Sequence, residues 1–447
     1  MRSETGGRRG DYHGARFSWK KILVMAAGAG LVVGTPALAA ITSSSAGAST
    51  FRAAVGYPAG QTITIAPGTG AYLQYAFVDR SGVVYWRKEY ASGAWTGWSL
   101  LATTQPAETV TTLTSVSPLT WAPGSDGSTM ELFAEDAGLV YVTWLTTTAT
   151  HPWSAWTPMV APGTTLDSFY WGDIVYAPGT NGHLQQIFAY TTPTGYVFEK
   201  AESAGGSWGK WSELPTRTYG FYYDGLDLTY APGSNGSTQE LIAYTETTGG
   251  IYVTWTSHGT WAPWATFRPS AATVNGPTTL TYPFYPGTTY APGSNGSLQE
   301  LFAVGNTSDV FVDWENPGGS WSGWTIMGHA TTGFLHSRIT YAPGSDGSVQ
   351  EIFATTFTST GGAWVNWENP GGAWAGWHSM GLTAITFDEP TSASGFTYTN
   401  VSYAPGTNGA LQEIAATSAT PTNPTYLQWE NPGGTWSGWH LWSDTTS

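Results

Sequence analysis

The eleven residues WENPGGSWSGW at positions 314–324 carry most of the information about the fold, because the chain contains this segment three times. It returns as WENPGGAWAGW at 367–377 and as WENPGGTWSGW at 429–439. In each copy Pro holds the second position and Gly the third position of a four-residue turn, which is the type II signature. The Pro-Gly-Gly therefore predicts a chain reversal between two strands.

The same unit recurs in weaker form along most of the chain. An Ala-Pro-Gly tag preceded by an aromatic residue or Ile occurs seven times, with its proline at 67, 123, 178, 232, 292, 343 and 405. After each tag come two strand-like runs, such as LQELFA and VFVDW, and then two tryptophans three residues apart. These pairs are Trp95/Trp98, Trp153/Trp156, Trp208/Trp211, Trp261/Trp264, Trp321/Trp324, Trp374/Trp377 and Trp436/Trp439. Because each of the seven tags is followed by one tryptophan pair, the sequence predicts seven structural repeats.

Each repeat has the pattern of four short antiparallel strands. The Asn-Gly or Asp-Gly that follows most tags tolerates the positive φ of a tight hairpin turn. Four strands per repeat without helical periodicity predict an all-β fold, a seven-bladed β-propeller. We expect a signal peptide at 1–39, a short linker at 40–55 and the propeller at 56–447, with blades at roughly 56–104, 105–160, 161–215, 216–268, 269–328, 329–382 and 383–447.

The first 39 residues have the pattern of a secretory signal peptide. Basic residues precede an apolar run at Ile22–Gly34, and Ala37-Leu38-Ala39 offers a cleavage site. This segment holds six of the 15 basic and two of the 30 acidic residues, so its removal takes the net charge from −15 to −19. That charge argues against nucleic acids and anionic membranes as partners. No later stretch is long enough to span a membrane, so we expect a secreted protein.

Tryptophan occupies two kinds of position. The paired tryptophans fit wedges between blades, since large aromatic residues dominate cores. A further tryptophan ends the third strand of five repeats, but Lys88 and Ala201 replace it in the other two, which a wedge required for packing would not accept. The candidate carbohydrate-binding residues are these tryptophans and the glutamates that follow three of them: Trp144, Trp255, Trp314, Trp367, Trp429, Glu315, Glu368 and Glu430.

An indole face beside a carboxylate acceptor suits a sugar. The alternative interpretation is packing at the edge of a pocket with a solvated glutamate. A second set of glutamates recurs in the buried second strand: Glu131, Glu240, Glu300, Glu351 and Glu413. A buried charge needs partners, so we expect this set to tie each blade to its neighbour rather than to bind ligand.

The stretch GSLQELFAVGNTSDVFVDWENPGGSWSGW at 296–324 resembles the blade repeat of the bacterial PLL-like lectins, whose blades pair an LEVF-type strand with a GGWSGW-type ending. The resemblance extends from about Gly56 to the end of the chain. It implies a seven-bladed propeller that binds fucose or related, sometimes O-methylated, sugars between adjacent blades. The first repeat departs from it with Tyr75 and Lys88, and the third with Gln186 and Ala201, which puts the sites of those blades in question.

No catalytic constellation stands out. Gly205–Gly209 (GGSWG) matches G-x-S-x-G, but it lies in a turn without a strand-to-helix context. The histidines lack the spacing of zinc ligands. A glycosidase needs two carboxylates at one centre, and the acids outside the repeat form no evident pair: Asp224, Asp227, Asp388 and Glu389.

The sequence therefore predicts a multivalent lectin whose partners are glycans or glycoconjugates. We expect no enzymatic activity, catalytic residue, metal or cofactor, and the oligomeric state is left open. Several weak sites on one ring would add avidity on a surface that bears glycans. The alternative is a propeller that scaffolds a protein partner, and a second alternative is a glycoside hydrolase.

Overall fold

The computed structural model describes most of the chain after residue 62, and every described residue belongs to the compact unit Arg52–Ser447. The described ranges are 63–69, 71–80, 83–101, 119–125, 130–136, 138–145, 153–159, 168–169, 174–192, 194–215, 226–245, 250–257, 259–267, 288–304, 309–328, 339–355, 362–380, 398–418 and 425–442. The expected signal peptide and linker lie outside them, as do Asp224, Asp388 and Glu389. Within these ranges no helix is long and apolar enough to cross a membrane.

The strands form seven antiparallel sheets, each built from strands consecutive in the chain. Blade 1 contains β1 (Ile63–Pro67), β2 (Tyr72–Arg80), β3 (Val83–Tyr90) and β4 (Ser99–Leu100). Blade 2 contains β5 (Thr120–Pro123), β6 (Met130–Asp136), β7 (Leu139–Leu145) and β8 (Thr157–Met159). Blade 3 contains β9 (Ser168–Phe169), β10 (Val175–Pro178), β11 (His183–Thr192), β12 (Val197–Ser203) and β13 (Ser212–Glu213).

The other four blades follow the same order. Blade 4 contains β14 (Leu226–Pro232), β15 (Gln239–Thr245), β16 (Ile251–Ser257), β17 (Thr260–Trp261) and β18 (Ala265–Thr266). Blade 5 contains β19 (Thr288–Pro292), β20 (Gln299–Val304), β21 (Val310–Glu315) and β22 (Thr325–Ile326). Blade 6 contains β23 (Thr340–Pro343), β24 (Gln350–Thr355), β25 (Ala363–Glu368) and β26 (His378–Ser379). Blade 7 contains β27 (Tyr398–Pro405), β28 (Gln412–Ser418), β29 (Thr425–Asn431), β30 (Thr435–Trp436) and β31 (His440–Leu441).

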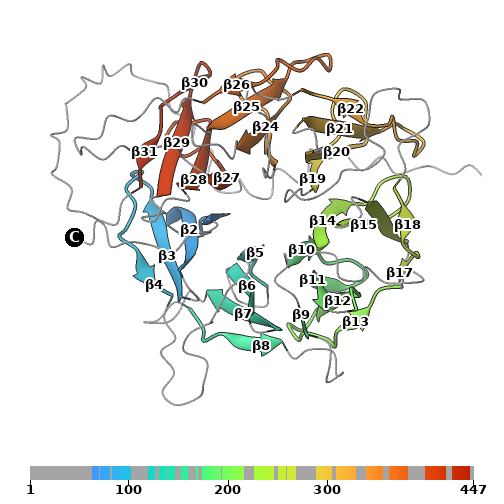
Figure 1. Ribbon diagram of the computed structural model, residues 1–447. Coiled ribbons are helices and arrows are strands. Elements are labelled where there is room, and N and C mark those ends of the chain that lie inside the picture. The colour runs from blue at the N-terminus through green and yellow to red at the C-terminus, as the bar shows by residue number, and fades with distance from the viewer. Residues whose placement is uncertain are drawn as a thin grey trace, which may run out of the picture. The chain divides into compact units, whose positions relative to one another are not determined.

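These sheets form a seven-bladed β-propeller, which confirms the fold predicted from the repeats (Figure 1). The first strands of successive blades contact one another all the way round, including β27 with β1. Because β1 pairs with β2, it begins the first blade rather than completing the last one. The ring therefore closes by packing of blade 7 against blade 1, without exchange of a strand.

Hydroxyl groups in the first strands tie each blade to the next at six of the seven interfaces. Each donates to a carbonyl of the following blade: Thr64 to Leu119 at 2.8 Å, Thr120 to Ile174, Thr229 to Thr288, Thr289 to Ile339 and Thr340 to Val401 at 2.5 Å, and Ser402 to Ile63. The closing interface thus uses the same bond as the internal ones. Val175 holds the equivalent position in blade 3, so this bond is missing between blades 3 and 4.

The two turns predicted from sequence have the expected geometry. Asn295 and Gly296 both have positive φ, at 45° and 99°, as a tight hairpin turn requires. In the Pro-Gly-Gly turn, Gly318 has φ of 103° and the N–H of Gly319 donates to the carbonyl of Asn316 at 3.0 Å. These values match a type II turn with glycine at its third position.

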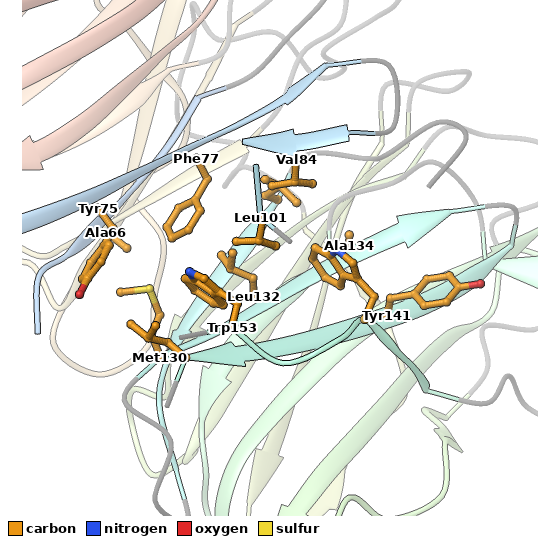
Figure 2. Close-up of a cluster of buried hydrophobic side chains, with 13 residues drawn as sticks. Ala66, Tyr75, Phe77, Val84, Leu101, Met130, Leu132, Ala134, Tyr141 and Trp153 are labelled. Atoms are coloured by element: carbon orange, nitrogen blue, oxygen red, sulfur yellow. The ribbon is translucent and has the colours of Figure 1, made fainter. Parts of the chain in front are cut away.

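The hydrophobic core lies between the blades. Between blades 1 and 2, Phe77 from β2 and Trp153 from the following blade point toward one another (Figure 2), with ring centroids 5.5 Å apart and nearly perpendicular planes. The first tryptophan of the pair meets a phenylalanine of the preceding blade in the same way at four further interfaces: Phe133–Trp208, Phe188–Trp261, Phe302–Trp374 and Phe353–Trp436. The paired tryptophans pack between the blades as predicted. Five of them are buried, and the other nine are half-buried: the buried ones are Trp153, Trp156, Trp211, Trp324 and Trp439.

The recurring second-strand glutamates tie neighbouring blades, as predicted. A glutamine of the following blade donates to each of them: Gln185 to Glu131 at 2.7 Å, Gln299 to Glu240 at 2.8 Å, Gln350 to Glu300 and Gln412 to Glu351 at 2.6 Å, and Gln74 to Glu413 at 3.3 Å. The last of these crosses the closing interface. Each carboxylate is therefore stabilised by a hydrogen bond from the neighbouring blade.

Candidate functional site

Adjacent residues of the third strand face different neighbours. In β21, Trp314 packs against the cluster that blade 5 shares with blade 6. The next residue, Glu315, instead accepts hydrogen bonds from Ser234 and Asn235 of blade 4, both at 2.6 Å. Alternation along a strand explains the split. The tryptophan and glutamate that are neighbours in sequence thus lie in different interfaces. The interface between blades 5 and 6 combines Trp314 of one blade with Glu368 of the next.

One such combination surrounds a cavity of roughly 670 Å³ between blades 5 and 6. Blade 5 contributes Trp314, and blade 6 contributes Glu368 and Trp374. Further polar lining comes from Ser294, Asn295, Asn316 and Asn366, and apolar lining from Val312, Ile326 and Met327. A cavity of this size, with aromatic walls and a few polar groups, has the dimensions of a small-molecule site.

The carboxylate of Glu368 is held by the turn of blade 5. Asn295 donates to its Oε1 at 2.7 Å, and Ser294 donates to its Oε2 at 2.5 Å. Gln350 of its own blade adds a bond to Oε2 at 2.9 Å. A carboxylate has about four acceptor positions, so these three bonds orient Glu368 without using its full capacity.

The Pro-Gly-Gly turn contributes to the same interface. The backbone N–H of Gly371 donates to Asn295 Oδ1 at 2.9 Å, while the other end of this amide holds Glu368. Asn295 thereby joins the first turn of blade 5 to the second turn of blade 6. This contact gives the repeated WENPGG segment a physical reason: its glutamate and its turn backbone are both bound by the preceding blade.

Equivalent carboxylates sit in equivalent surroundings. Ser345 donates to Glu430 Oε2, and Gln412 does so at 2.7 Å. Burial raises the pKa of Glu430 above its ordinary value, and the nearby Glu351 and Asp346 raise it further while the bonds from Ser345 and Gln412 lower it. At the closing interface Thr407 and Asn408 donate to Glu89 at 2.8 and 2.9 Å.

The other third-strand tryptophans differ in how much of the indole is free. Trp367 stacks on His378 with ring centroids 4.4 Å apart, and Trp429 stacks on His440 at 4.3 Å. In blade 5 the equivalent of these histidines is Thr325, which lines the cavity beside Trp314. Trp144 is half-buried against blade 3, and Trp255 is 39% exposed.

Blades 1 and 3, which lack the third-strand tryptophan, form different interfaces. In blade 1, Lys88 Nζ donates to the hydroxyl of Tyr72 at 2.6 Å, within an aromatic group that includes Tyr75 and Trp86. In blade 3, Ala201 replaces the tryptophan, and Glu199 Oε2 accepts from Trp261 Nε1 of blade 4 at 2.8 Å. Neither interface repeats the pairing of Trp314 with Glu368.

Sequence reasoning missed one set of residues. At the third-strand position two residues before the glutamate, every blade has a buried polar side chain: Arg87, Thr143, Lys200, Thr254, Asp313, Asn366 and Gln428. The available signal was a polar residue at one position of a buried strand in every copy, with six different residue types among the seven. Burial raises the pKa of Asp313 to about 6, opposed by hydrogen bonds from Ser322 and Gly323.

Among the residues that the structure describes, no group of three His, Asp or Glu side chains could hold a metal ion. Asp227, the one described acid among the four outside the repeat, is 8% exposed in β14.

No protein-family model matches the chain, and no curated protein matches it. Among solved structures it is similar to the BP39L lectin from Burkholderia pseudomallei, at 17% identity over 87% of this chain and all of that one, with a TM-score of 0.60. A Bacteroides uniformis protein described as a putative 6-phosphogluconolactonase has 12% identity over 81% of this chain and 91% of its own, with a TM-score of 0.45. Aleuria aurantia lectin, in complex with α-methyl-L-fucoside, has 12% identity, coverage of 86% and 94%, and a TM-score of 0.41.

The similarity to BP39L lectin concerns the fold. The TM-scores of the other two proteins lie below 0.5. The chain therefore shares its propeller architecture with a bacterial lectin over nearly its whole length.

Proposed function

We propose that this chain is a secreted lectin that binds glycans in cavities between its blades. The observation that carries the proposal is the cavity between blades 5 and 6, where Trp314 offers an aromatic face and Glu368 a carboxylate already oriented by blade 5. Sugars combine apolar C–H faces with hydroxyl groups, so stacking on an indole together with a few fixed hydrogen bonds is the chemistry they require.

The proposal extends to fucose and related sugars, including O-methylated ones, on the resemblance of the repeat to the PLL-like lectins. Trp144, Trp255, Trp367 and Trp429 are proposed as the counterparts of Trp314, with Glu315 and Glu430 as counterparts of Glu368. The fold shared with BP39L lectin supports the proposal that the chain is a lectin. Secretion is proposed from the first 39 residues.

Tryptophan variants separate binding from folding. Trp314→Ala, Trp367→Ala and Trp429→Ala together remove three stacking faces that are only half-buried, so we expect sugar binding to fall by about tenfold or more while the β-sheet circular dichroism persists. Trp324→Ala is the control, since that indole is 3% exposed in the core and its loss lowers the free energy of unfolding by about 3–5 kcal/mol. Unfolding of the triple variant would instead assign these tryptophans to the core.

A further inference from the structure

The side chain of Asn366 has an unused hydrogen-bond donor beside the cavity. Asn366 lies in β25, is completely buried and lines the cavity between blades 5 and 6. The backbone N–H of Gly376 donates to its Oδ1 at 2.9 Å, which identifies the oxygen end of the amide. Its Nδ2 has no hydrogen-bond partner. Buried polar atoms are nearly always paired, so an unpaired donor on a cavity wall indicates a missing acceptor.

The carboxylates of Glu300 and Glu368 also line this cavity, but neither accepts a hydrogen bond from Asn366 Nδ2. The neighbouring cavity walls are formed by Val312, Trp314, Met327 and Trp374, which belong to the apolar cluster of this interface. An amide N–H₂ in such a setting selects an oxygen with a free lone pair. An occupant that stacks on the indoles and presents an ether or hydroxyl oxygen to Nδ2 satisfies both features.

The equivalent position of the preceding interface has the opposite polarity. Asp313 pairs with Leu301 in the same register in which Asn366 pairs with Ile352. Asp313 Oδ1 accepts from Ser322 and Gly323 at 2.9 and 2.8 Å, while its Oδ2 is buried without a hydrogen-bond partner. The unused atom is thus an acceptor between blades 4 and 5, and a donor between blades 5 and 6.

We propose that this third-strand position determines specificity in these two interfaces, with Asn366 donating to a sugar oxygen and Asp313 accepting from a sugar hydroxyl. The inference rests on the proposed function, since it assigns a role within the same sites. A hydroxyl satisfies either residue because it both donates and accepts. A methyl ether keeps the acceptor and loses the donor, so the interface with Asn366 tolerates it and the interface with Asp313 rejects it.

Asn366→Asp tests the donor with little structural disturbance. Aspartate keeps the oxygen that Gly376 binds and replaces only the N–H₂ group, and Asp313 shows that the fold accepts aspartate at this position. The probes are methyl α-L-fucoside and its mono-O-methyl ethers, titrated calorimetrically as monovalent ligands so that site number is measured without avidity. We expect Asn366→Asp to lose one site for the ether whose methylated oxygen faces this position, and to keep its sites for the unmodified fucoside.

The reciprocal variant keeps the test valid if Asn366→Asp does not fold. Asp313→Asn converts the acceptor of the preceding interface into a donor, so we expect it to gain one site for the same ether. A wild-type chain that binds the fucoside, with site numbers unchanged in both variants, would overturn the specificity role alone. Absence of binding of any probe to the folded wild-type chain would overturn the proposed fucose binding, and this inference with it.

Discussion

Individual carboxylates at the interfaces can hold two blades together and also border a cavity in which we propose that a ligand binds. Glu368 is 4% exposed and receives three hydrogen bonds from two blades, yet it borders the cavity beside Trp314. Its carboxylate accepts hydrogen bonds from the turn of blade 5. These hydrogen bonds fix the position of the carboxylate. A fixed acceptor binds a hydroxyl with less loss of conformational freedom than a mobile one.

Glu368→Ala should lower the free energy of unfolding by about 1–3 kcal/mol, because the buried Gln350 and the part-buried Ser294 each lose an acceptor, while the exposed Asn295 bonds to water instead. Urea unfolding followed by tryptophan fluorescence measures the change. Glu368→Gln keeps one acceptor oxygen and should cost less. An alanine variant as stable as the wild-type chain would show that this carboxylate does not hold the blades together.

At the scale of the element, the Ala-Pro-Gly tag depends on a close backbone approach. A Cβ on Gly293 would lie 2.3 Å from the carbonyl oxygen of Ser297, and similar distances hold at Gly68, Gly179, Gly233, Gly344 and Gly406. The alanine of the tag is fully buried at Ala291, so it has no room for a larger side chain. Steric limits at both residues explain why the tag is repeated while the loops differ.

Gly293→Ala should therefore destabilise the fold by about 1–3 kcal/mol, the range for forced overpacking. Gly205→Ala is the matched control, since a Cβ there meets no atom within 4 Å and the backbone φ lies outside the positive region. Thermal unfolding of the two variants beside the wild-type chain gives the comparison. Equal melting temperatures for both variants would contradict the steric account of the tag.

The repeat made the elements predictable, while the site was predictable only in part. Spacing of the tags and tryptophan pairs revealed seven blades, because each copy must satisfy the same turn and packing geometry. The sequence suggested Trp314 and the glutamate that follows it as site residues, but it did not reveal that Glu315 faces blade 4 and that Glu368 of the next blade completes the cavity. Asn366 was missed because its role depends on contacts across an interface, which a single strand does not contain.

At the scale of the whole molecule, the closing interface carries one of the two glutamates whose pKa is raised most among the described residues. Burial raises the pKa of Glu89 to about 7 from its ordinary value of 4.5; Glu413 raises it further, and bonds from Thr407 and Asn408 lower it. Burial likewise raises the pKa of Glu135 to about 7. The folded chain therefore binds these protons more tightly than the unfolded chain does.

Stability should fall as the pH rises through this window. The stability that Glu89 contributes is fully present below about pH 4.5, where this side chain is protonated in both the folded and the unfolded chain. It is lost as the pH rises past 7, because the folded chain must then hold a charged carboxylate in a buried position. We expect a higher melting temperature at pH 5 than at pH 8, and a smaller difference in Glu89→Gln, which keeps an acceptor for Thr407 and Asn408 but does not titrate. A higher melting temperature at pH 8 would contradict the assignment.

Seven interfaces in one ring also bear on function, because several weak sites on a rigid scaffold give avidity that one site does not. The interfaces are not equivalent: Trp314 and Glu368 meet at a cavity, whereas Lys88 and Ala201 replace the tryptophan in blades 1 and 3. Multivalent binding through a subset of interfaces is what these differences predict.

A glycan array probed with residues 40–447 tests this account most directly. We predict binding to one coherent class of sugars, competed by the free monosaccharide, with Trp314→Ala weaker than the wild-type chain on the same array. An array without signal from folded protein would contradict the lectin and favour a protein-binding scaffold. Release of product from an aryl glycoside would favour a glycoside hydrolase instead.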